Sequence, residues 1–165
     1  MANWNEAVIL LTGYASGETD FATRCGRLSA ADMQTLEQLA VRIGSAMNEQ
    51  QSMAVLLLEG HSDRQDLPGM TTEQRRASEL DASTKRVASA YQWFQARIAD
   101  AAGPPDCQDQ WSRILLVPNA FGAATLINAS PTSEQQRLQN RRVALTVRTL
   151  NLSTFPEPVE TQSID

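Results

Sequence analysis

An uninterrupted apolar run over residues 53–58 constrains the fold of this chain more than any other stretch. Its length and continuity indicate a buried strand, which predicts a central position in a sheet. Gly60 follows the run and allows the chain to turn sharply as it leaves the strand. Asp63 therefore falls just beyond the carboxyl end of the strand, where the loops of α/β sheets commonly hold ligands.

Two stretches have the periodicity of amphipathic helices. Ser29 is a suitable N-cap with Asp32 three residues further on, and apolar residues then recur at helical spacing, which predicts a helix over residues 30–48. A second apolar stripe predicts a helix over residues 83–99. Residues 64–80 between the strand and this helix are polar and contain a Pro-Gly turn signal, which predicts a loop in which a short helix could begin at Thr71.

The remaining strand signals complete the fold class. Residues 114–117 are continuously apolar, and alternation of apolar residues over 143–147 predicts a last strand with one buried face. Near the N-terminus, residues 8–11 and the segment from Phe21 both compete for the first strand, and the sequence leaves the choice open. We therefore predict an α+β protein of order β-α-β-α-β-β, with a mixed sheet, its two main helices on one face, and an optional extra N-terminal strand.

Three short motifs follow one another along the chain: Gly60-His61-Ser62-Asp63, Ala82-Ser83-Thr84-Lys85-Arg86-Val87, and Asn140-Arg141-Arg142-Val143. In this order they resemble the OmpA/MotB C-terminal (OmpA-like) family of peptidoglycan-binding domains, whose corresponding motifs are G-[HY]-[TS]-D, L-S-x-x-R-A and an N-R-R-V that opens the final strand. The resemblance covers roughly residues 21–147. It implies the OmpA-like sandwich as the fold.

The resemblance also implies a domain organisation. Residues 1–150 are expected to form a single OmpA-like domain, with residues 1–20 as an extra N-terminal segment and residues 64–80 as an inserted loop. Residues 151–165 contain two prolines and three acidic side chains, and they are expected to form a disordered acidic tail.

Members of this family hold the diaminopimelate residue of the peptidoglycan stem peptide. Its far stereocentre carries an ammonium and a carboxylate, so a binding cleft must present an acceptor beside a donor. By resemblance, Asp63 accepts from the ammonium and the planar fork of Arg86 binds the carboxylate. Ser62 replaces the commoner threonine and adds a hydroxyl contact. Without a ligand, Asp63 and Arg86 could instead form a plain salt bridge.

Two further residues are assigned to the site with open roles. Glu79 stands where the family often has asparagine, seven residues before the arginine, and its carboxylate could strengthen the grip on the ammonium or repel the carboxylate of the ligand. Arg141 and Arg142 point to opposite faces of the last strand, so only one of them can face the cleft. We assign Arg142 to the ligand and expect the other to be a solvated surface charge.

Composition restricts the other function classes. A net charge of −5 disfavours nucleic acid as a partner, and no apolar run approaches the length of a membrane span. His61, the only histidine, and Asp63 offer two metal ligands without a third, so we expect no metal, no cofactor and no catalytic residue. Cys25 and Cys107 could form one disulfide or remain two free thiols.

The functional prediction is therefore a non-enzymatic, periplasmic domain that binds peptidoglycan and anchors a parent protein to the cell wall. Any signal or membrane anchor is expected in segments outside this sequence, and a second copy of the chain or an envelope complex could be a further partner. The alternative is a structural or interaction domain of an envelope assembly, on the same fold with an altered ligand site. A hydrolase acting on wall peptides is the third and weakest hypothesis.

Overall fold

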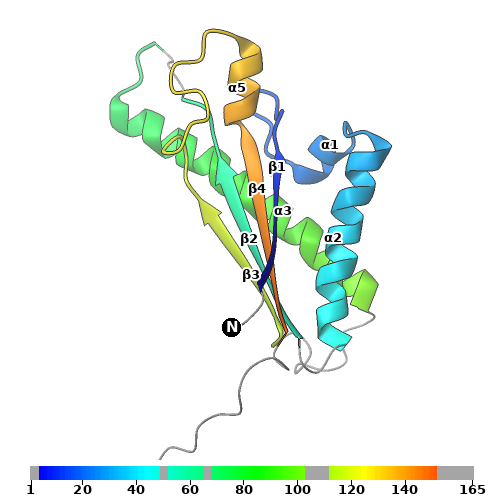
Figure 1. Cartoon of the computed structure of the whole chain (residues 1–165). Coiled ribbons are helices and arrows are strands. Elements are labelled where there is room, and N and C mark those ends of the chain that lie inside the picture. The colour runs from blue at the N-terminus through cyan, green and yellow to red at the C-terminus, as the bar shows by residue number, and fades with distance from the viewer. Residues whose placement is uncertain (1–3, 49–51, 65–67, 103–111, 152–165) are drawn as a thin grey trace, which may run out of the picture.

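The computed structural model describes residues 4–48, 52–64, 68–102 and 112–151 (Figure 1). The described elements, in chain order, are β1 (Trp4–Leu11), α1 (Phe21–Cys25), α2 (Ala30–Asn48), β2 (Ser52–His61), α3 (Thr72–Ala102), β3 (Ile114–Ala120), α5 (Glu134–Asn140) and β4 (Arg142–Asn151).

The strands in the described part of the chain form one four-stranded mixed sheet with the order β1-β4-β2-β3. β2 lies inside the sheet, parallel to β3 and antiparallel to β4, while β1 is antiparallel to β4 at one edge. The register pairs His61 with Arg142 and Gly60 with Val143, so the end of β2 meets the start of β4. The predicted central position of the apolar run is confirmed.

The core lies between the sheet and the helices α2 and α3, which pack against the same face (Figure 1). Alternate side chains of β2 and β4 turn towards these helices and are fully or almost fully buried: Ala54, Leu56, Leu58, Val143, Leu145 and Val147. The helices contribute the facing apolar side chains, among them Ile43 of α2 and Phe94 of α3. The predicted α+β order, mixed sheet and one-sided helices are confirmed.

Of the two candidates for the first strand, residues 8–11 form part of a strand of the sheet, β1, and the segment from Phe21 does not. The segment from Phe21 is the short helix α1, whose N-cap Asp20 accepts a hydrogen bond from the backbone N–H of Thr23 at 2.6 Å. Phe21 and Cys25 are four residues apart, so a helix turns both into the core, where both are buried. The described residues contain no extra N-terminal strand, and the segment 1–20 includes the first strand of the common sheet.

The predicted loop over residues 64–80 is wrong in its second half, because α3 already begins at Thr72. Thr71 and Gln74 cap this helix reciprocally: the backbone N–H of Gln74 donates to Thr71 Oγ1, and that of Thr71 donates to Gln74 Oε1. Most side chains of residues 72–80 are exposed, so no apolar stripe marks these turns in the sequence. The predicted disordered tail lies outside the described residues except for Asn151, which ends β4.

β2 and α3 approach each other closely at Gly60. A Cβ at this position would lie 2.3 Å from the carbonyl oxygen of Ser83 and 3.1 Å from Cβ of Val87. We expect Gly60→Ala to lower the free energy of unfolding by about 2–3 kcal/mol, because the backbones must separate. Urea unfolding measures this change. The control is Gly26→Ala, where the nearest atom is 3.5 Å away, and an equal loss in both variants would contradict the close approach.

Candidate functional site

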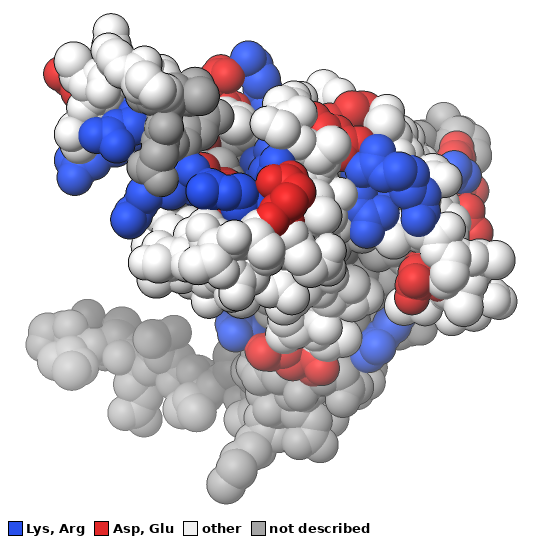
Figure 2. All heavy atoms as spheres, turned by 90° about the horizontal axis from the view of Figure 1, so that it is seen from above, with Lys and Arg blue, Asp and Glu red and all other residues white. Residues whose placement is uncertain are grey.

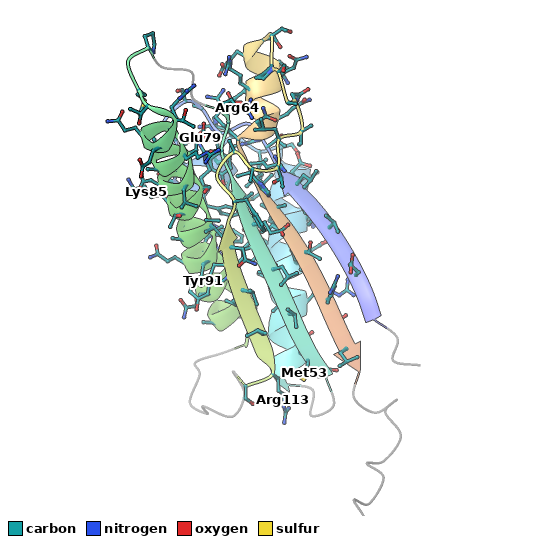
Figure 3. All side chains as sticks on the ribbon, turned by 90° about the vertical axis from the view of Figure 1, so that its left-hand side faces the viewer. Met53, Arg64, Glu79, Lys85, Tyr91 and Arg113 are labelled. Carbon is teal, nitrogen blue, oxygen red and sulfur yellow. The ribbon has the colours of Figure 1, made fainter. Side chains whose placement is uncertain are left out.

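The three sequence motifs meet at one end of the sheet, where β2 ends, β4 begins and α5 stands just beyond the strand ends (Figure 1). In Figure 3 this is the end that carries Arg64 and Glu79, opposite the end that carries Met53 and Arg113. A cavity of ≈ 330 Å³ opens here, which we call the Asp63–Arg86 cavity. Its walls are formed by Ser16, Gly17, Ser62, Asp63, Arg64, Ala82, Arg86, Glu134, Arg137 and Arg141.

Arg86, on α3, is the charged group buried most deeply in this cavity, with 2% of its surface exposed. Its Nε donates to the carbonyl oxygen of Glu18 at 2.9 Å, its Nη1 donates to that of His61 at 2.8 Å, and its guanidinium lies 5.2 Å from the centre of the Tyr14 ring. Within the described residues, no carboxylate forms an ion pair with Arg86, and Nη2 has no hydrogen-bond partner.

Burial lowers the pKa of Arg86 to about 10, although the nearby Tyr14 acts in the opposite direction. The guanidinium is therefore still charged at neutral pH. A buried cation with only carbonyl oxygens and an aromatic ring as partners favours the entry of an anion.

Asp63 is held by side chains of α5 and not by Arg86. Its Oδ1 accepts from Nδ2 of Asn140 at 2.9 Å, and its Oδ2 accepts from Nη1 of Arg137 at 2.9 Å. The plain Asp63–Arg86 salt bridge that the sequence allowed is thus not formed. A carboxylate has about four acceptor positions, so Asp63 keeps capacity for an ammonium group.

Ser62 leaves a buried hydroxyl at the cavity wall. Its backbone N–H donates to the carbonyl oxygen of Gly122 at 2.8 Å, but its Oγ has no hydrogen-bond partner in the described part of the chain, and only 3% of the residue is exposed. An unsatisfied buried hydroxyl costs about 1–3 kcal/mol. A ligand group that bonded this oxygen would remove that cost.

Arg141, the C-cap of α5, and Arg142, the first residue of β4, face the opposite sides from those expected. Arg141 lines the Asp63–Arg86 cavity and donates through Nη2 to Glu134 Oε1. Arg142 turns to the other face of the sheet, where its Nη2 donates to the carbonyl oxygen of Thr125 at 2.9 Å. Both side chains are buried, so neither is a solvated surface charge. The cause is that α5 covers one side of this strand end and the loop after β3 covers the other.

Glu79 does not line the Asp63–Arg86 cavity. Figure 3 shows Glu79 on α3, and in the sequence it lies two turns before Arg86. Glu79 is buried, in the wall of a neighbouring cavity that Arg75 and Arg76 also line. The Glu79 carboxylate therefore lies outside the cavity that Arg86 lines, and it belongs to the second cavity instead.

His61 packs at the end of β2, on the face that Arg142 occupies. Its ring stacks on Phe121 with a centroid distance of 5.4 Å, and its Nδ1 lies 2.9 Å from Oγ1 of Thr125. Burial, with a smaller contribution from the charge of Arg142, lowers the pKa of His61 to about 4. The folded protein therefore holds this imidazole neutral, as a packed ring that orders the loop after β3.

This histidine predicts a loss of stability in mild acid. The unfolded chain takes up a proton near pH 6.5, whereas the folded chain does so only near pH 4, so stability falls as the pH is lowered through this window. We expect the free energy of unfolding to drop by about 2 kcal/mol between pH 7 and pH 5. His61→Gln should remove most of this drop in urea unfolding. An unchanged drop in the variant would assign the effect to other groups.

Arg137, Asn140 and Arg141 are site residues whose roles the sequence did not reveal. The last two belong to the motif that opens β4, but their partners could not be read from it. Arg137 lies outside all three motifs. The pattern Ser133-x-x-Gln136 is a capping signal that could have predicted the short helix α5, because Ser133 caps it and accepts from the N–H of Gln136.

The described residues contain neither a candidate metal site nor a candidate membrane-spanning helix. No three His, Cys, Asp or Glu side chains there come together as a potential metal site. Likewise, none of the helices described has the length and hydrophobicity needed to cross a membrane. Cys25 is a free, buried thiol whose pKa is raised by burial to about 11, and Cys107 lies outside the described residues.

Several solved structures have a similar fold. A putative MotB-like protein from Desulfovibrio vulgaris has a TM-score of 0.50 at 16% identity, and the match covers 98% of this chain and 81% of that chain. The cell wall anchor of the T6SS from Pseudomonas aeruginosa has a TM-score of 0.45 at 20% identity, with 88% and 86% covered. The peptidoglycan-associated lipoprotein from Burkholderia pseudomallei has a TM-score of 0.47 at 18% identity, with 73% and 80% covered. No protein-family model and no curated protein sequence matches the chain.

At these identities the likeness establishes the fold, and that fold is the OmpA-like one expected from the motifs.

Proposed function

We propose that this domain binds peptidoglycan non-covalently through the diaminopimelate residue of the stem peptide, and so anchors its parent protein or complex to the cell wall. The observation that carries the proposal is the buried Arg86 guanidinium, which lines a cavity and has no carboxylate partner among the described residues. Burying an unpaired charge is costly, and a ligand carboxylate that reaches Nη2 offsets this cost.

The other side chains of the cavity complement the rest of a zwitterionic centre. Asp63 supplies an acceptor for the ammonium and lies near enough to Arg86 to raise its pKa slightly. Ser62 supplies a hydroxyl that lacks a partner in the described part of the chain. A volume of ≈ 330 Å³ is at the lower end of the range of ligand sites, which suits one amino-acid head group.

The proposed role is non-catalytic and needs no cofactor or metal. It implies a periplasmic location, since that is the compartment of the cell wall. A second copy of the chain or an envelope complex is the further partner that this role implies.

One observation favours the alternative of a structural or interaction domain without a ligand. The ion pair between Asp63 and Arg137, at 2.9 Å, already satisfies part of the carboxylate that an ammonium would need. Under this alternative, Asp63 only holds α5 to the end of β2.

Sedimentation with insoluble peptidoglycan separates the two functions. The anchoring role predicts that the protein pellets with diaminopimelate-type peptidoglycan and is released by free diaminopimelate. Peptidoglycan with lysine in place of diaminopimelate is the control, because lysine lacks the second carboxylate. Protein that stays in the supernatant with both materials would support the interaction domain instead.

A further inference from the structure

A second and larger cavity, of ≈ 730 Å³, lies beside the first at the same end of the sheet. It is bounded by the residue that follows Asp63, by the first turns of α3 and by the loop after β3. Its main side chains are Arg64, Arg75, Arg76, Glu79, Leu80 and Phe121, and we call it the arginine cavity. Arg64 lines both cavities, so the two cavities adjoin at this side chain.

The charge of the arginine cavity is opposite to that of the chain. The chain carries −5 overall, whereas three arginines and one glutamate line this cavity. The guanidinium groups of Arg64 and Arg76 form no hydrogen bond or ion pair with any residue that the structure describes. Figure 2 looks down on this end of the molecule and shows several groups of Lys and Arg side chains on it.

The N-terminus of α3 adds to this positive potential, since Thr72 in its first turn also lines the cavity. Arg64 after β2 and the first turns of α3 thus both favour an anion in the arginine cavity.

The arginine cavity also has an apolar part, formed by Leu80 of α3 and by Phe121 in the loop after β3. Leu80 is 49% exposed and Phe121 is 37% exposed, which leaves both side chains available to a ligand. Phe121 is fixed by its stacking on His61. Its neighbour Gly122 is fixed by a hydrogen bond of 2.9 Å from its N–H to Oγ of Ser83 on α3. These groups together suit a ligand that presents a carboxylate and an apolar group.

We propose that the arginine cavity binds the part of the stem peptide that precedes diaminopimelate, with Arg76 and Arg64 pairing with the free carboxylate of its acidic residue. This inference rests on the proposed function. In stem peptides that residue is a glutamate joined through its side chain, so its α-carboxylate is free, and an alanine comes before it. The alanine methyl group then contacts Leu80 and Phe121. The domain thereby distinguishes wall peptides with a free glutamate carboxylate from those in which it is amidated.

Calorimetric titration with three ligands tests this reading: free diaminopimelate, the Ala-γ-Glu-diaminopimelate tripeptide, and the same tripeptide with the glutamate carboxylate amidated. We expect the free-acid tripeptide to bind about fivefold more tightly than the amidated one, a factor typical of an exposed ion pair. Arg76→Gln should remove this difference while the affinity for free diaminopimelate stays unchanged, because Arg76 lines only the arginine cavity. Arg148→Gln, on the exposed face of the sheet, is the matched control.

The outcomes separate this inference from the proposed function. Equal affinity for the two tripeptides, with diaminopimelate still bound, would overturn the arginine cavity alone. A preference for the free acid that survives in Arg76→Gln would also overturn it. Failure of the native protein to bind diaminopimelate and either tripeptide would overturn the proposed function and this inference together.

Discussion

Arg86→Gln is expected to weaken the binding of diaminopimelate by more than ~100-fold, equal to about 3 kcal/mol, because it removes one member of a buried charge pair. The side chain keeps its place on α3, but the ligand carboxylate enters the cavity without a counter-charge. The effect on folding is smaller. The variant loses the bonds to the carbonyl oxygens of Glu18 and His61, yet it also removes a buried charge. Calorimetry gives the affinity, and circular dichroism verifies the fold.

Arg86→Lys separates charge from geometry. A lysine retains the positive charge but lacks the planar fork that reaches two carbonyl oxygens and a ligand carboxylate together. We therefore expect intermediate binding, about tenfold weaker than that of the native protein. The control is Arg148→Gln, which removes a guanidinium paired with Glu6 far from the cavity. Native affinity in Arg86→Gln would contradict the role assigned to this residue.

Asp63→Asn is expected to weaken the binding of diaminopimelate by ~30-fold, or about 2 kcal/mol, because the ammonium of the ligand loses its anionic acceptor. An asparagine is of equal size and can still accept from either Arg137 or Asn140. We expect a loss of stability of about 1–3 kcal/mol from the weakened bond to Arg137. Titration calorimetry and urea unfolding of the same preparation separate the two effects.

Asp81→Asn is the matched control for Asp63→Asn, because this exposed carboxylate on α3 pairs only with Lys85 among the described residues. The double variant Asp63→Asn/Arg86→Gln should lose clearly less affinity than the sum of the single losses, since both residues act on one bound group. Strict additivity would indicate that the two side chains do not share a ligand.

The elements with a clear hydrophobic period could be predicted from the sequence. The continuous run of β2 and the helical stripes of α2 and of the second half of α3 each determine a buried face. Residues 72–80 carry no such stripe, because they extend beyond the sheet and pack little. The start of their helix is defined by the capping pair Thr71 and Gln74, a local signal that is weak beside the polar composition of the segment.

The site could be predicted only in part, because its side-chain contacts join residues that are far apart in the sequence. Ser62, Asp63 and Arg86, which the motifs single out, line one cavity, and their binding role stays a prediction. Alternation along β4 indicated that Arg141 and Arg142 face opposite sides, but not which side holds the cavity, because that depends on where α5 packs. The pairing of Asp63 with Arg137 joins residues 74 positions apart, and no local pattern predicts such a contact.

The central claim is that Arg86 recognises the second carboxylate of diaminopimelate. The most direct measurement compares the affinities for free diaminopimelate and for lysine, which lacks that carboxylate, in the native protein and in Arg86→Gln. The account predicts that the native protein prefers diaminopimelate by ~100-fold and that Arg86→Gln binds both ligands equally weakly. Equal affinities in the native protein, or a preference that persists in Arg86→Gln, would contradict it.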